Sequence, residues 1–159
     1  MNKTVFSLFA ALLLFSFVAC KNADKEDHSG HNTHEPKTQA DSLMSDVMDG
    51  HDVGMAKYGK LQAMEKKVKA ALDSITKLPA KTREGLSAYK SQLDSLAADL
   101  SYALFAMDKW MEEFDMDSAK DDMQKRIQYL LDEKMKVGKV KDAILNSLSR
   151  ADSLLKPAQ

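Results

Sequence analysis

Apolar residues recur every three or four positions between residues 86 and 114, a spacing typical of an α-helix that packs against other helices. The steps alternate between three and four without interruption through Leu86, Tyr89, Leu93, Leu96, Leu100, Ala103, Met107, Trp110 and Phe114. Such an alternation is the seam of a coiled coil. The pattern predicts a helix over about residues 81–114.

A second periodic segment follows near the C-terminus. Its apolar positions are Met123, Ile127, Leu130, Val137, Val140, Ile144, Leu148, Ala151 and Leu155, with Lys134 as a single polar interruption. Ser118 lies three residues before Asp121 and is close to a capping box, a signal for a helix start. We therefore expect a helix over about residues 118–154.

The N-terminal part of the periodic region is less regular. One stripe contains Met44, Met48, His51, Met55 and Tyr58, and a phase-shifted stripe contains Leu61, Met64, Val68, Ala71, Ile75 and Leu78. Gly50, Gly54 and Gly59 interrupt it, and each costs about 1 kcal/mol relative to alanine in a helix. Either the helix begins after one of the first two glycines, or the glycines let another helix approach closely. We favour one helix over about 42–77 with a weak first third.

Short polar breaks separate these three helices. Pro79 disfavours helix at the residue before it, and residues 115–117 read Asp-Met-Asp. Short connections place neighbouring helices antiparallel. The predicted fold is all-α: an elongated antiparallel up-down-up three-helix bundle with coiled-coil-like seams, over residues 41–156. Sustained seams can also recruit a second chain, so a homo-oligomer is an open alternative.

The N-terminus has the layout of a secretory signal peptide. Lys3 precedes an apolar run over residues 5–19, which ends at Cys20, the only cysteine. A small residue followed by cysteine resembles a bacterial lipoprotein processing site, although Phe17 stands where leucine is usual. This resemblance implies that residues 1–19 are removed and that Cys20 becomes the lipid anchor. The alternative is an uncleaved membrane anchor, but the run is shorter than the ~20 residues that a spanning helix needs.

Residues 20–40 are polar and are predicted to form a disordered linker. Its start, Lys21 followed by acidic residues, loosely resembles a surface-export signal of Bacteroidetes-type lipoproteins. We expect an outer-membrane lipoprotein of the cell envelope, facing the periplasm or the cell surface. His28, His31 and His34 repeat at intervals of three and would bind Zn²⁺ or Cu²⁺ loosely, or are simply part of a polar tether.

Composition removes several classes of function. The chain has 23 Lys and Arg against 24 Asp and Glu, a net charge of −1, with no basic aromatic patch, so nucleic-acid binding is not expected. Lipidation of Cys20 would consume the only thiol. No phosphate loop or hydrolase motif is present, and His51 is the only histidine in the predicted bundle. We predict that the protein is not an enzyme.

The predicted topology brings methionines together at one end of the bundle. That end collects Met48, His51, Met55, Met107, Trp110 and Met111. Thioethers favour Cu(I), imidazole can join them, and an indole face can stabilise a cation. Methionine is also a common filler of cores and forms adaptable docking surfaces. A copper site, core packing and a partner surface are therefore alternatives for these residues.

The pattern His51-Asp52-x-x-Met55-x-Lys57, followed by a heptad helix ending in Met107-x-x-Trp110-Met111-x-x-Phe114, resembles a family of small helical Bacteroidetes-type lipoproteins. Members often carry automatic names such as viral A-type inclusion protein. The resemblance covers most of residues 44–150 and implies no activity. It gives weight to His51, Met55, Trp110 and Met111 as a unit.

These observations favour a non-enzymatic, lipid-anchored envelope protein without a cofactor, whose bundle binds an unidentified envelope partner. The rival hypothesis is a metal-handling lipoprotein for copper, or for zinc, that uses the methionine-rich end. A third alternative is a coiled-coil oligomer with a mechanical role.

Overall fold

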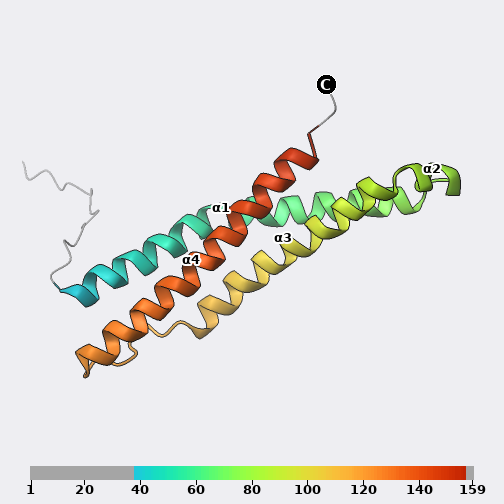
Figure 1. The fold of residues 1–159 in the computed structure, drawn as a ribbon. Coiled ribbons are helices and arrows are strands. Elements are labelled where there is room, and N and C mark those ends of the chain that lie inside the picture. Colours follow the sequence, from blue (N-terminus) through green and yellow to red (C-terminus); the bar gives the residue numbers. More distant parts are fainter. Residues whose placement is uncertain (1–37, 157–159) are drawn as a thin grey trace, which may run out of the picture. The chain divides into compact units, whose positions relative to one another are not determined.

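The computed structural model describes residues 38–156, and every regular element within that range is a helix (Figure 1). The helices are α1 (Gln39–Thr76), α2 (Ala80–Gly85), α3 (Ser87–Glu113) and α4 (Met123–Leu154). The predicted all-α class is confirmed. The expected signal peptide (1–19), Cys20, and the linker with His28, His31 and His34 lie outside the described residues, except for residues 38–40.

α1 is one uninterrupted helix that contains all three glycines of the irregular segment. It begins two residues earlier than the predicted bundle, because Thr38 caps it and accepts a hydrogen bond from the Asp41 amide at 3.1 Å. Ala40 is 5% exposed, so this first turn is already part of the core. The end of the predicted linker is therefore helical.

The segment expected as one helix over 81–114 is divided into two. Pro79 stands at the N-cap of the short helix α2, and Leu86 forms a turn before α3 begins. The amide of Leu86 donates to the Arg83 carbonyl oxygen at 3.1 Å, a tightened bond that ends α2. The side chain of Leu86 is partly buried and packs against the core.

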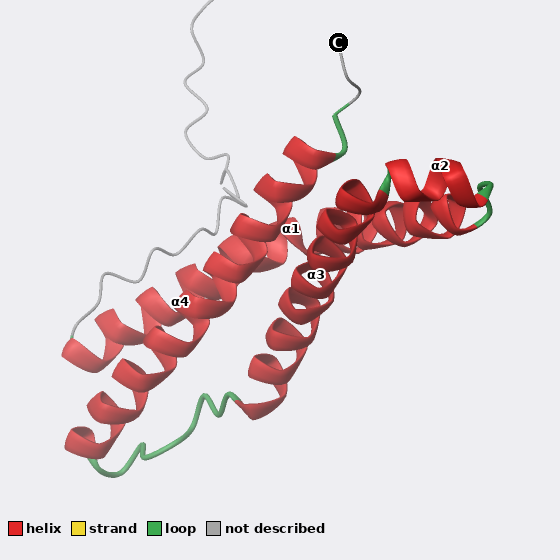
Figure 2. Ribbon diagram, turned by 45° about the vertical axis from the view of Figure 1, so that its right-hand side comes forward, coloured by secondary structure: helices red, strands yellow, loops and turns green. Residues whose placement is uncertain are grey.

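α4 begins at Met123 rather than near residue 118, and a loop of residues 114–122 precedes it (Figure 2). Asp122 is the N-cap, and its carboxylate accepts from the Lys125 amide at 3.1 Å. The expected capping box at Ser118 is wrong, because the carbonyl oxygen of Ser118 instead accepts a bond from the Arg126 guanidinium at 2.7 Å. Ala119 in this loop has a positive φ of 55°, which is incompatible with a helix.

Hydrogen bonds and ion pairs between side chains show the relative direction of the three long helices. α1 and α3 are antiparallel, with bonds from Tyr58 to Asp108 and from Ser101 to Glu65. α3 and α4 are antiparallel, with bonds from Trp110 to Glu133 and from Arg150 to Asp99. α1 and α4 are parallel, with bonds from Lys134 to Asp46 and from Lys60 to Asp152.

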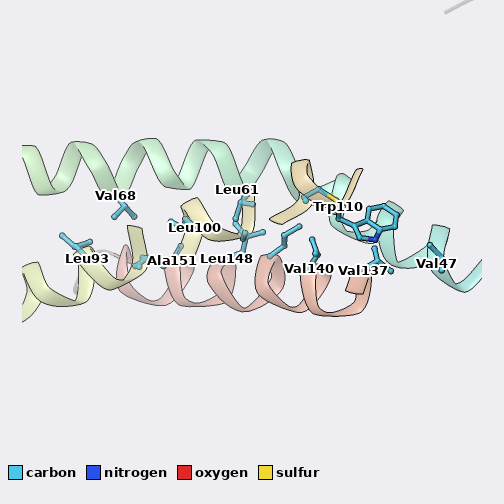
Figure 3. Close-up of a cluster of buried hydrophobic side chains, with 14 of the residues drawn as sticks. Val47, Leu61, Val68, Leu93, Leu100, Trp110, Val137, Val140, Leu148 and Ala151 are labelled. Carbon is cyan, nitrogen blue, oxygen red and sulfur yellow. The ribbon is translucent and has the colours of Figure 1, made fainter. Parts of the chain in front are cut away.

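The core lies along the axis shared by these helices (Figure 3). Every seam position of α3 from Leu93 to Trp110 is 5% exposed or less. α4 ends soon after Asp152, which pairs with Lys60, whereas α1 continues to Thr76. The last turns of α1 therefore lie beyond the end of α4, where α1 pairs with α3 and α2 closes the turn (Figure 1).

Candidate functional site

Two glycines let α1 approach the other helices closely beside the candidate site. A Cβ atom on Gly50 would lie 3.0 Å from Val137 Cγ1, and one on Gly54 would lie 2.4 Å from Met107 Cε. Nothing lies within 4 Å of a Cβ on Gly59. The first two glycines thus serve close packing, which was one of the alternatives for this segment.

His51 lies on α1 between these two glycines and contacts the core from its edge. Its side chain is 21% exposed, and its Nδ1 atom lies 2.9 Å from Asp52 Oδ1. Its ring centroid is 5.6 Å from that of Trp110, with the planes tilted by 38°. The sequence prediction that His51 and Trp110 share one end of the bundle holds in this geometry.

Trp110 begins a row of aromatic rings that leads to the loop before α4. Its ring stacks on Phe114 at 4.8 Å, and Phe114 stacks on Tyr129 at 6.2 Å. The Tyr129 hydroxyl accepts a bond from the Asp115 amide at 2.7 Å. Burial raises the pKa of the Tyr129 phenol. The row fixes the end of α3 against the start of α4.

Glu133 is a buried carboxylate that the sequence analysis missed. It is 3% exposed, and its Oε2 atom accepts a bond from Trp110 Nε1 at 2.9 Å. Lys136 Nζ lies 2.7 Å from the other oxygen, and this bond raises the pKa of Lys136. A signal was present: Glu133 stands three residues after Leu130 and four before Val137, so it, and not Lys134, occupies the seam position. Figure 3 shows the indole nitrogen directed toward α4.

The candidate methionines fall into two groups. Met107 is fully buried beneath Gly54 and belongs to the core. Met48 is half-buried, whereas Met55 and Met111 are 36% and 39% exposed. Met55 and Met111 each lie one turn from the Tyr58–Asp108 bond, toward the same end of the bundle. The predicted set therefore separates into one core residue and three that reach the surface.

A different surface lies on the side of α3 that faces away from the core. Tyr102 and Phe105 are 62% and 60% exposed and are three residues apart, so they share one face of the helix. The core residues Leu100 and Ala103 lie on the opposite side. We call Tyr102 and Phe105 the outer aromatic pair.

Comparison with known proteins gives no relative: no family model, curated protein or solved structure matches the chain. Within residues 38–156, no helix has both the length and the apolar character to cross a membrane. In the same residues, no three His, Cys, Asp or Glu side chains gather in a metal-binding arrangement.

Proposed function

We propose that the protein is a non-enzymatic, lipid-anchored protein of the cell envelope whose up-down-up three-helix bundle is an interaction domain. The observation that supports the interaction role most directly is the outer aromatic pair. Two aromatic side chains that are about three-fifths exposed on one helix face form an apolar patch, and such a patch is more informative of binding than a single exposed apolar residue. Tyrosine is also among the residues that contribute most to binding energy at protein interfaces.

The anchoring part of the proposal comes from the sequence before the bundle. The apolar run that ends at Cys20 supports processing of residues 1–19 and attachment to the outer membrane through Cys20. The bundle then faces either the periplasm or the cell surface. The partner is an envelope protein, and a second copy of this chain is the alternative partner. Similarity to the small Bacteroidetes-type lipoproteins accords with this placement.

Crosslinking in living cells tests the interaction role. A photoreactive residue replaces Phe105, and a matched control places the same residue at Lys139, an exposed position on α4. We expect a discrete crosslinked product from position 105 that disappears with Tyr102→Ser, while the helix content measured by circular dichroism is unchanged. The same product from both positions, or none from position 105, would contradict the role of the outer aromatic pair.

The anchor is tested separately. Cys20→Ser should abolish incorporation of labelled palmitate and move the protein out of the membrane fraction. If the variant stays in the membrane fraction without label, residues 5–19 hold the protein as an uncleaved anchor instead.

Metal handling is the second candidate function, with copper favoured over zinc. The contact of the His51 ring with Trp110, together with the bond from His51 to Asp52, supports it. An interaction domain alone does not require either contact. A Cu(I) titration of the whole chain, described below, tests this candidate.

A further inference from the structure

We infer that Met48, His51 and Met55 bind a soft monovalent metal ion, Cu(I), with the face of Trp110 as one wall of the site. The inference rests on the metal-handling candidate and is independent of the outer aromatic pair. It reduces the metal-binding set that the sequence predicts to three ligands, and adds Asp52 as an orienting carboxylate and Glu133 as a positioning residue.

The three ligands lie on one side of a single helix. Met48 precedes His51 by three residues and Met55 follows it by four, and α1 is continuous through all of them. Residues at these intervals are neighbours on a helix surface, and a pair of ligands four residues apart is a known way to hold a metal ion. Met48 and Met55 are about 10 Å apart along the axis, so His51 lies between them.

Asp52 prepares the imidazole for metal binding. A carboxylate only accepts hydrogen bonds, so the 2.9 Å bond between Asp52 and His51 assigns the proton to Nδ1. In the neutral ring, Nε2 then keeps its lone pair. A carboxylate on the far nitrogen is the usual partner of a metal-bound histidine, since it fixes the ring and makes it a stronger ligand.

Trp110 supplies the aromatic wall. Its ring centroid lies 5.6 Å from the His51 ring, and Glu133 holds its nitrogen on the side of α4. A cation within about 6 Å of an indole face is attracted to it, more strongly where water is partly excluded. Trp110 is only 5% exposed, which meets this condition. Glu133 is thus a positioning residue that acts through Trp110.

The chemistry of this set selects the metal. Two thioethers and one imidazole suit Cu(I), whereas Zn²⁺ and the harder ions prefer thiolate, imidazole or carboxylate ligands. Met107 has no part in the site, because its terminal methyl group packs beneath Gly54 beside Ile144. It therefore provides a matched control, as does Met135, which is 60% exposed elsewhere on α4.

The test is a competition titration with Cu(I) alone against a chromophoric chelator, without oxygen. The protein is the full chain in detergent with His28, His31 and His34 changed to alanine, which removes the tether histidines. We expect one bound Cu(I). Met48→Leu and Met55→Leu should each weaken binding at least tenfold, and Asp52→Asn about 10- to 100-fold. His51→Ala should weaken it more than Asp52→Asn does.

Met107→Leu and Met135→Leu should leave the dissociation constant unchanged. Methionine and leucine have similar volumes, so these variants separate a lost ligand from lost packing. A site that responds to Met107→Leu as strongly as to Met48→Leu would overturn the assignment of ligands. No competition with the chelator would overturn the site itself.

Trp110 reports directly on the wall, because it is the only tryptophan. Cu(I) should quench its fluorescence at one equivalent, and His51→Ala should remove the quenching. Glu133→Gln keeps an oxygen that can accept the hydrogen bond from the indole, so this variant should preserve the quenching. Glu133→Leu should reduce the quenching and leave the binding stoichiometry at one. Tight binding without any change in fluorescence would exclude Trp110 from the site. Failure of the metal site leaves the crosslinking result from position 105 untouched, so the two proposals fail separately.

Discussion

Gly54→Ala should destabilise the protein, although alanine is the better helix former. A Cβ at this position would lie 2.4 Å from Met107 Cε and 3.3 Å from Ile144 Cδ1, both in the core. Overpacking of a core typically costs about 1–3 kcal/mol. The gain in helix propensity is about 1 kcal/mol. The free energy of unfolding should therefore fall by up to about 2 kcal/mol.

Gly59→Ala is the matched control in the same helix. Nothing lies within 4 Å of its added Cβ, so only the propensity term remains. This variant should be more stable than the wild type by about 1 kcal/mol. The two substitutions are chemically identical, and the difference of about 1–3 kcal/mol between them measures the close approach of α1 to its neighbours.

Met107→Leu should rescue the variant, because leucine lacks the terminal methyl group that Gly54→Ala would meet. Alone, Met107→Leu should cost less than about 1.5 kcal/mol. In a double-mutant cycle measured by urea unfolding and circular dichroism, Gly54→Ala and Met107→Leu should be coupled, whereas Gly59→Ala and Met107→Leu should be additive. Equal stabilisation by Gly54→Ala and Gly59→Ala would refute the reasoning.

Three further predictions concern polar groups. The hydroxyl of Tyr58 donates to Asp108 at 2.6 Å, which raises the pKa of Tyr58 from 10.0 to about 12. Its contribution to stability is complete below pH 10.0 and lost as the pH rises through about 12, so near-ultraviolet phenolate absorbance should show a late step that Tyr58→Phe removes. The bond from the Lys125 amide lowers the pKa of Asp122. The contribution of this cap to stability is therefore complete above the ordinary pKa of an aspartate and is lost as the pH falls through the lowered pKa. Asp122→Asn should make thermal unfolding less sensitive to acid. Glu133→Leu should cost about 1–3 kcal/mol in urea unfolding, since the Trp110 N–H loses its acceptor, and Glu133→Gln should cost less.

The seam of α3 was predictable because apolar residues occupy one side of the helix over many turns. Its positions from Leu93 to Trp110 are buried as the spacing indicates. The helix ends were less predictable, since they depend on tertiary contacts. The turn at Leu86, whose side chain packs against the core, separates α2 from α3. In the loop before α4, the Arg126 guanidinium donates a hydrogen bond to the Ser118 carbonyl oxygen. Neither contact has a local signature.

The same limit applies to the candidate site. Topology was enough to place His51 and Trp110 at one end, because both lie at regular positions on long helices. Topology could not show that Met107 is buried and Met55 exposed, since the burial of Met107 depends on the close approach of α1 at Gly54. Glu133 was missed because a carboxylate is rarely fully buried, and its burial here depends on an indole from another helix.

Because α1 is a single unbroken helix, its length sets the distance between the two ends of the helix pair that it forms. Its 38 residues span about 57 Å from the capped start at Thr38 to the turn before α2. His51 lies in the first half of α1. The last turns of α1, which pair with α3 beyond the end of α4, form its far end. One added heptad in both helices there would extend the reach by about 10 Å and keep every ring and carboxylate near His51 in place. The length of the far end and the geometry around His51 can therefore be varied independently.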